Sequence, residues 1–251
     1  MLVFDDVSKS FFSNKPNEVK ALDQLSLTVS SGEFVSVVGA NGSGKSTLQN
    51  LVAGTVMADR GDIRLDGERI TQLADYKRSR WVARVFQDPL QGTAPELSIL
   101  DNFRLAALRG KAKKLKIGID KPFKKRVQQQ VQLLNMGLED KIHQPMGLLS
   151  GGQRQALTLL MTVMSDVKLL LLDEPTAALD PRSASRVMEL ADNLVADYQL
   201  TVLFITHNMK EALRYGNRLI QLSHGRIKRD LGAEDKGLLK PQDLYEWFNE
   251  D

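Results

Sequence analysis

The chain of 251 residues contains no cysteine. This excludes a disulfide framework and a thiolate metal site, and it suits a reducing compartment without proving one. No apolar run reaches the length of about 18 residues that a membrane span needs. The opening stretch MLVFDDVSKS carries two acids where a secretory signal would carry positive charge. We therefore expect a cytosolic chain, and its 42% of hydrophobic residues allow a sizeable core.

The chain also lacks a strong excess of either charge, because its formal net charge is only +3. The charges are unevenly distributed, however, since residues 109–126 hold nine Lys or Arg and a single acid. This segment is best interpreted as a solvated helix and loop, and a face toward lipid head groups stays open as an alternative. Phe123 is its one aromatic residue, so base stacking is disfavoured and we predict no nucleic-acid partner.

The hydrophobic pattern predicts strands that alternate with helices. Three short alternating runs predict strands with one solvent-exposed face, at 2–4, 25–29 and 62–67. Three denser apolar runs predict strands buried on both faces, at 34–38, 169–172 and 201–205. Helical spacing predicts an amphipathic helix over about 182–198, and residues from about 90 to 150 hold no convincing strand. We therefore expect an α/β fold with a mostly parallel, doubly wound sheet and an inserted helical lobe.

A phosphate-binding pattern follows the first of these buried strands. Residues Gly39–Thr47 read GANGSGKST, which matches G-x-x-x-x-G-K-[ST] between a strand and a helix. Glycines let the backbone wrap closely around a phosphate, and the helix adds the positive end of its dipole. Lys45 can reach the β- and γ-phosphates, Ser46 can ligate Mg²⁺, and Thr47 can support the phosphates.

A pair of acids ends the second buried strand, in the stretch KLLLLDEP at 168–175. Ligands bind at the carboxyl edge of such sheets, where the carboxylate of Asp173 would emerge. This carboxylate can hold Mg²⁺ or its water. Glu174 points differently and can accept a proton from a water that attacks the γ-phosphate.

A second glycine-containing turn lies at 149–153, which reads LSGGQ. The helix that follows it presents free N–H groups and a positive dipole end. This turn therefore predicts an anion site that has no obvious anion of its own.

Taken in this order, the Gly39–Thr47 loop, LSGGQ and LLLLDEP resemble the ATPase subunit of an ATP-binding cassette (ABC) transporter. Smaller features of the sequence also match the family. Gln87 after ARVF matches its Q-loop glutamine, and TAALD at 176–180 resembles its D-loop. His207 after TVLFIT matches its switch histidine, and Phe11 matches the aromatic residue that stacks on adenine. The resemblance covers about residues 2–230. It implies a P-loop NTPase fold with an antiparallel β subdomain, divided into an ATPase domain at 1–230, a helical subdomain at 88–148 within it, and a helical tail at 231–251.

The resemblance also implies roles for individual residues. Glu174 would be the general base, His207 would contact the γ-phosphate, and Gln87 would sense Mg²⁺ and connect to the helical lobe. The implied catalytic set is Glu174, His207, Lys45 and Gln87, and the implied metal ligands are Ser46, Gln87 and Asp173. The implied ATP-binding residues are Phe11, Gly39, Asn41, Gly42, Ser43, Gly44, Lys45, Ser46, Thr47, Ser150, Gly151, Gly152, Gln153 and Asp180.

The family answers the question that the second turn raises. In these ATPases two chains meet head to tail and enclose two ATP molecules, so Ser150, Gly151 and Gly152 would bind the γ-phosphate held by the other copy. Gln153 would orient the turn, and Asp180 would arrange the opposing site. ATP would then close the dimer and hydrolysis would loosen it, because only in the closed dimer do the phosphate loop of one copy and the LSGGQ turn of the other bind the same γ-phosphate. We expect ATP and Mg²⁺ as cofactors and a second copy of the chain as a partner.

The resemblance further implies a transport function. A transmembrane permease would dock around residues 88–105, on the cytoplasmic face of a bacterial inner membrane, and an extracytoplasmic substrate-binding protein would act indirectly. The stretches VFQDPLQGTAPELSILDN and THNMKEALRYGNRLIQL look most like uptake systems of the tryptophan or tyrosine type. We therefore expect import of an amino acid or a similar small solute. A lipid- or lipoprotein-trafficking ATPase and a soluble ATPase of the iron–sulfur assembly type stay open as alternatives.

Overall fold

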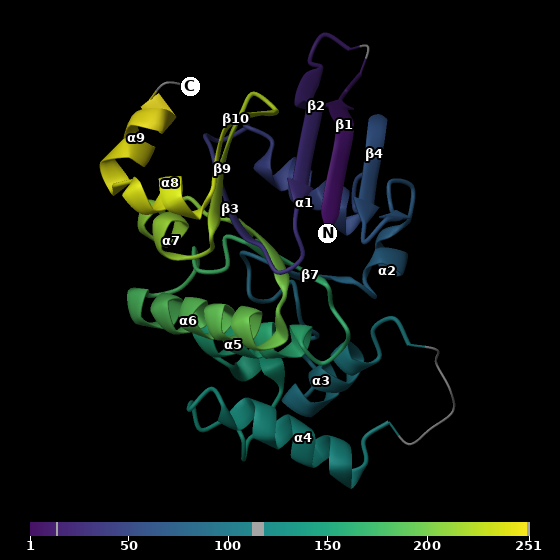
Figure 1. Ribbon diagram of the computed structural model, residues 1–251. Coiled ribbons are helices and arrows are strands. Elements are labelled where there is room, and N and C mark those ends of the chain that lie inside the picture. The colour runs from purple at the N-terminus through teal and green to yellow at the C-terminus, as the bar shows by residue number, and fades with distance from the viewer. Residues whose placement is uncertain (14, 112–117, 250–251) are drawn as a thin grey trace. The chain divides into compact units, whose positions relative to one another are not determined.

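The computed structural model (Figure 1) describes residues 1–251 except 14, 112–117 and 250–251. The chain forms two compact units. The first contains residues 1–78, 171–174 and those from 199 onward, and the second contains residues 79–170 and 175–198. Each unit is described by itself, and the domain boundaries expected from the sequence stay a prediction. Within the described residues, every helix is too short or too polar to cross a bilayer.

A four-stranded antiparallel sheet opens the first unit, in the order β2-β1-β4-β5. Its strands are β1 (Leu2–Phe11), β2 (Val19–Val29), β4 (Arg60–Leu65) and β5 (Glu68–Arg69). The strands β1 and β2 extend further than alternation predicted. The register between them shifts after Phe4 and again after Val7, and such irregularities break the two-residue period from which a strand is recognised in a sequence.

The larger sheet of the first unit has the order β10-β9-β3-β8-β7. Its strands are β3 (Phe34–Val38), β7 (Leu169–Asp173), β8 (Thr201–Ile205), β9 (Arg218–Ser223) and β10 (Arg226–Leu231). The central β3 runs parallel to both β8 and β9, whereas β9 and β10 form an antiparallel pair. Every residue of β3 and β8 is buried, as their unbroken apolar sequences predicted.

The described residues of the first unit form the helices α1 (Lys45–Ala53), α2 (Asp75–Arg78), α7 (Met209–Arg214), α8 (Ala233–Leu238) and α9 (Pro241–Asn249). The described residues of the C-terminal tail pack on the rest of this unit. Leu244 of α9 is fully buried in one cluster with Met209 and Ala212 of α7 and with Val38. The tail therefore covers α7, beside which it is drawn in Figure 1.

The second unit is mainly helical. It contains β6 (Val82–Val85), α3 (Ile99–Ala107), α4 (Lys121–Gln132), the 3-10 turn Met146–Leu148, α5 (Gly151–Thr162) and α6 (Pro181–Tyr198). The strand β6 is the next in order after β7, whose first two residues belong to this unit. Among the described residues of 86–150, one isolated bridge between Ser98 and Pro145 is the only β pairing.

Packing of α5 against α6 forms the centre of this unit, where the two helices lie side by side (Figure 1). The helix α6 begins one residue before the predicted helix and buries one face, which includes Val187, Ala191 and Leu194. Tyr198, which continues the apolar spacing, is nevertheless 47% exposed at the end of the helix. The amphipathic pattern thus predicts the buried face but overextends it by one turn.

Candidate nucleotide site

The loop between β3 and α1 has a backbone that only glycine can follow at Gly44. This residue stands just before α1 with φ 105°. A Cβ atom added to it would lie 2.5 Å from the carbonyl oxygen of Ala21 and 2.8 Å from Cδ2 of Leu22. The loop is therefore held tightly against β2, and its shape is fixed before any ligand arrives.

The side chain of Lys45 fills the inside of this loop. The residue is 5% exposed, and its Nζ donates to the carbonyl oxygens of Gly39, at 2.8 Å, and Ala40, at 2.9 Å. Burial lowers the pKa of Lys45, and the carboxylates of Glu174 and Asp173 act in the opposite direction. An ammonium group is thus fixed where a phosphate would enter the loop.

The carboxyl edge of the larger sheet joins an acid and an imidazole. Asp173 ends β7 and Glu174 follows it, whereas His207 follows β8. The Nε2 atom of His207 lies 2.7 Å from Oε1 of Glu174. The backbone of Glu174 has φ 46°, and its N–H donates to the carbonyl oxygen of Ile205 at 2.9 Å. Glu174 therefore lies where its carboxylate can take a proton and His207 can orient it.

Most of the other predicted residues of the first unit belong to the same loop or to the start of α1. Asn41, Gly42 and Ser46 are exposed, Thr47 is half-buried, and Ser43 and Gly44 are buried. Phe11 ends β1 and is half-buried, with Nζ of Lys9 5.6 Å from the centre of its ring.

No cluster of three or more His, Cys, Asp or Glu suited to a metal occurs in the described part of the chain. A metal here would need oxygen ligands from its substrate as well.

The turn before α5, in the second unit, is an ordinary capped helix start. The hydroxyl oxygen of Ser150 accepts from the N–H of Gln153 at 3.3 Å, and Oε1 of Gln153 accepts from the N–H of Ser150 at 3.1 Å. This reciprocal pair is a capping box. It uses an acceptor of Ser150 and leaves the O–H donor for another group.

Gly152 meets a packing constraint. A Cβ atom at Gly152 would lie 2.7 Å from Cβ of Ser183 on α6, whereas one at Gly151 would lie 3.3 Å from the flexible Cδ2 of Leu179. Asp180 caps the start of α6 by accepting from the N–H groups of Arg182 and Ser183, both at 3.1 Å. Hydrogen bonds from Ser183 are the main reason why the pKa of Asp180 is lowered.

The remaining predicted residue, Gln87, follows β6 and is exposed. The carbonyl oxygen of its neighbour Phe86 accepts from Nε2 of Gln155 at 2.8 Å. The same Nε2 donates to the carbonyl oxygen of Pro175 at 2.9 Å. Gln155 of α5 thus ties together the segments that adjoin Gln87 and Glu174 in the chain.

Comparison with known proteins identifies the family. The family described as "ABC transporter" matches residues 22–177. The chain is 40% identical to the Tyrosine transport ATP-binding protein of Clostridioides difficile, over 99% of this chain and 98% of that protein. The chain belongs to the ABC transporter family. Another member, the Thiamine import ATP-binding protein ThiQ of Vibrio parahaemolyticus, is 33% identical over 91% of this chain and 89% of that protein.

Solved ABC cassettes share the fold of this ABC ATPase. A dimeric ATP-binding cassette in a post-hydrolysis state, bound to ADP and Pi, matches with a TM-score of 0.78 and 26% identity, over 93% of this chain and 99% of that one. The P-loop ABC ATPase fold expected from the sequence is therefore confirmed. As a member of the family, the chain is an ATP-binding and ATP-hydrolysing subunit that energises transport.

Two glutamines that support the site of this ABC ATPase escaped the sequence analysis, Gln155 and Gln49. Gln49 of α1 is fully buried, and its Nε2 donates to the carbonyl oxygens of Leu172, at 3.0 Å, and Leu203, at 3.1 Å. It thereby joins the helix of Lys45 to the strands that lead to Glu174 and His207. Its position four residues after Lys45, on the same helix face, was the available signal.

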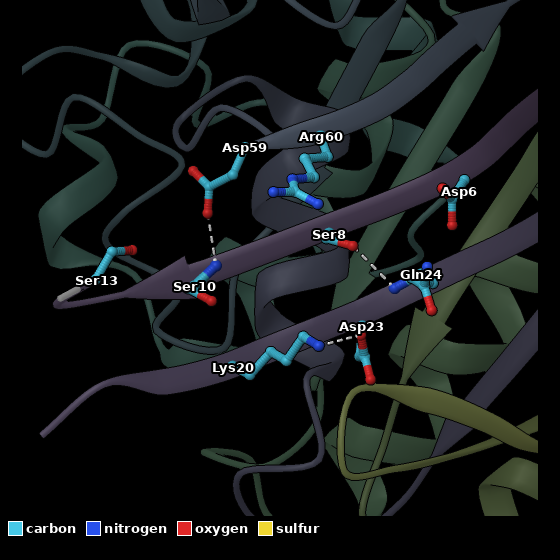
Figure 2. Close-up of a pocket in the computed structure, with 9 residues that line it drawn as sticks. All are labelled: Asp6, Ser8, Ser10, Ser13, Lys20, Asp23, Gln24, Asp59 and Arg60. Carbon is cyan, nitrogen blue, oxygen red and sulfur yellow. Dashed lines mark hydrogen bonds and ion pairs between the residues drawn. The ribbon is translucent and has the colours of Figure 1, made fainter.

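A separate cavity of this ABC ATPase lies along β1 and β2 in the first unit, with a volume of about 460 Å³. Figure 2 shows polar side chains lining it, among them Asp23 with Lys20 and Asp59 with the backbone N–H of Ser10. Hydrogen bonds from Lys20 and Arg226 lower the pKa of Asp23. Asp23 and Asp59 are thus paired within the protein, and we assign no ligand to this cavity.

Proposed function

We propose that two copies of this chain close head to tail around two Mg·ATP molecules and so drive import of an amino acid or a similar small solute. The proposed class of cargo rests on the name of the tyrosine transport relative, which aligns over almost the whole chain. The thiamine import relative supports the direction. The dimeric cassette with ADP and Pi supports the assembly of two copies.

The observation that carries the proposed chemistry is the pair of Glu174 and His207 beside Lys45. The Nε2–Oε1 distance of 2.7 Å lets His207 orient the carboxylate of Glu174, which would act as the general base toward water. Lys45 is close enough to Glu174 and Asp173 for their carboxylates to raise its pKa. Lys45 would hold the β- and γ-phosphates, and His207 would contact the γ-phosphate.

The residues of the loop also fit a magnesium ion. Ser46 offers an exposed hydroxyl at the start of α1, and Asp173 offers a carboxylate at the end of β7. A magnesium ion is usually held by one or two protein oxygens together with water and substrate phosphates, so a larger acidic cluster is not needed. When bound, the ion would neutralise charge on the phosphate oxygens. The roles of Gln87 in sensing Mg²⁺ and of Phe11 in stacking on adenine stay predictions.

The second unit would supply the other half of each site. Ser150, Gly151 and Gly152 would donate to the γ-phosphate bound by the partner copy, with Gln153 holding the turn. The free O–H donor of Ser150 and the exposed start of α5 support this role. Asp180 would arrange the opposing site from its cap on α6.

A transmembrane permease would complete the transporter. Members of this family work with membrane permeases, and we propose that the permease docks on the second unit, around the predicted residues 88–105. A cavity of about 360 Å³ lies there between the loop after β6 and the helices α3 and α5. The ATPase would then be a peripheral protein at the cytoplasmic face of a bacterial membrane, and a substrate-binding protein would deliver the cargo on the other side.

The replacement Glu174→Gln tests the proposed chemistry. General-base catalysis contributes about 10²–10⁴ in rate, so kcat should fall by that factor while ATP still binds. With Mg·ATP the variant should accumulate as a dimer in size-exclusion chromatography with light scattering. The exposed Glu68→Gln of β5 removes an equal charge from the same unit and should change neither result. Hydrolysis at the native rate would refute Glu174 as the base, and a strictly monomeric Glu174→Gln at saturating Mg·ATP would refute the dimer.

A further inference from the structure

The charged side chains that line the cavity in the second unit are positive. The residues lining it come from β6, the loop after it, α3 and α5. Of the described residues that line it, two are charged, and both are arginines, Arg84 and Arg109. The other lining residues are both polar, such as Thr158, and apolar, such as Met161 and Leu105, the last 53% exposed. The cavity therefore presents positive charge within a rim of mixed polarity.

Arg109, just beyond the end of α3, has a donor that the described residues do not satisfy. Its Nη1 atom is buried and makes no hydrogen bond to any of them. Burial also lowers the pKa of Arg109, although a guanidinium stays protonated at physiological pH. A buried donor without a hydrogen bond is costly, so a group that accepts from Arg109 gains more than it would from a fully solvated arginine.

The walls of the cavity are held in place before any partner arrives. Asn102 of α3 accepts from the N–H of Ala94 at 2.8 Å and donates to its carbonyl oxygen at 3.0 Å. These two hydrogen bonds hold the loop that lines the cavity against α3. The guanidinium of Arg84 lies over the ring of Phe86, 4.8 Å from its centre, and adds a second positive charge.

We propose that this cavity receives a carboxylate side chain, Asp or Glu, from the permease segment that docks there, with Arg109 as its anchor. The inference rests on the proposed docking and adds the chemistry of the contact. A planar guanidinium binds a carboxylate through two parallel hydrogen bonds. The polar and apolar side chains that line the cavity would pack against the rest of a protein segment, which favours a protein partner over a lipid head group.

Cross-linking in the assembled transporter identifies the docking segment. The chain has no cysteine, so Leu105→Cys provides a single attachment point for a benzophenone photo-cross-linker at the cavity rim. Membranes that carry the intact transporter are irradiated, and mass spectrometry locates the linked residue. We expect a permease peptide with Asp or Glu within about four residues of the link, one helical turn. A permease peptide without an acid there overturns the inference but leaves the docking intact. A link to lipid alone overturns both.

A double-mutant cycle on the purified transporter then tests the pair itself. Arg109→Gln should weaken the Kd between the ATPase and its permease in nanodiscs by about 30-fold or more, as should replacement of the permease acid by Gln. The two together should weaken it much less than the product of the single effects. Because the permease variant leaves the ATPase chain unchanged, its result stands even where Arg109→Gln fails to fold.

The matched control is Arg126→Gln, which removes an exposed positive charge from α4 in the same unit. It should leave the Kd within about twofold, as expected for a screened surface charge. An equal loss with Arg126→Gln, or strictly multiplicative effects in the cycle, would mean diffuse attraction to anionic lipid or protein and would overturn the assignment of Arg109.

Discussion

The turn before α1 and the turn before α5 both place glycine at the start of a helix, but their glycines meet different constraints. Before α1, Gly44 has φ 105° and its backbone approaches β2 closely, so the loop is shaped around the buried ammonium of Lys45. Before α5, the turn is an ordinary capping box and Gly152 leaves room for α6. The guanidinium of Arg154, in the first turn of α5, donates to carbonyl oxygens of the preceding segment.

In the proposed dimer, this difference would give the two halves of one site different tasks. The first loop has its own cation and a fixed shape, so we expect it to hold a phosphate alone. The second turn offers neutral donors and a helix dipole, worth about 0.3–1 kcal/mol to an exposed charge. We infer that the second turn binds a phosphate usefully only when the first loop, in another copy, presents it. Four substitutions break or sharpen this contrast.

The largest effect is expected for Gly44→Ala. The new Cβ would meet the carbonyl oxygen of Ala21 at 2.5 Å, and the residue would keep a φ that L-residues avoid. We expect the free energy of unfolding to fall by about 3 kcal/mol, measured by urea denaturation. Gly32→Ala is the matched control, because φ is +76° there but nothing lies within 4 Å. Equal losses in the two variants would show that the close approach to β2 is unimportant.

The replacement Lys45→Ala should have the next largest effect, on nucleotide affinity. A charge-assisted hydrogen bond contributes about 1.5–3 kcal/mol, so a fluorescent ATP analogue should bind about 10- to 100-fold more weakly. Lys77→Ala, an exposed lysine of α2 in the same unit, should leave the affinity unchanged. Native affinity in Lys45→Ala would show that the first loop does not depend on its cation.

The replacement Gly152→Ala tests the packing of α5 on α6. Its Cβ would lie 2.7 Å from Cβ of Ser183, so the free energy of unfolding should fall by about 1–2 kcal/mol without nucleotide. Combining it with Ser183→Gly removes the clashing atom and should recover part of this loss. Gly151→Ala, which faces a flexible leucine, should cost less. If Gly151→Ala is the more damaging variant, packing does not explain the second glycine.

The smallest effect is expected for Ser150→Ala, which removes the cap of α5. A lost N-cap costs about 1 kcal/mol in unfolding free energy. Ser150→Asn keeps a capping acceptor and should restore most of the stability. Its N–H₂ donor is placed differently from the hydroxyl, so in a Glu174→Gln background it should still weaken ATP-dependent dimerisation. Full recovery of both properties in Ser150→Asn would show that the hydroxyl itself is not required.

The sequence predicted the buried strands well and the exposed ones partly. The run Phe34–Val38 matches β3 residue for residue, because burial on both faces leaves an unbroken apolar signal. The run at 2–4 gave only the start of β1, which continues to Phe11 through register shifts that alternation cannot reveal. The loop around Lys45 was predictable because glycine spacing there encodes a local backbone shape.

The supporting residues could not be predicted in the same way. Gln49 and Gln155 each join segments far apart in the chain. The helix face that Gln49 shares with Lys45 is a local signal for its place, but nothing local marks the carbonyl groups that either glutamine binds. The resemblance implied separate roles for Glu174 and His207 but not their direct contact, because their separation depends on the neighbouring positions of β7 and β8 in the sheet.

The sequence by itself determined the local shapes of this protein: a phosphate loop after a buried strand, a capped helix start at Ser150, and an amphipathic α6. These depend on backbone geometry and spacing within a few residues. Only the tertiary structure decided that Gly152 must leave space for Ser183, and that Arg109 lines a cavity and has a buried donor without a hydrogen bond to the described residues. Such facts arise from side chains that the fold brings together or leaves unpaired, and those distances exist only in the folded chain.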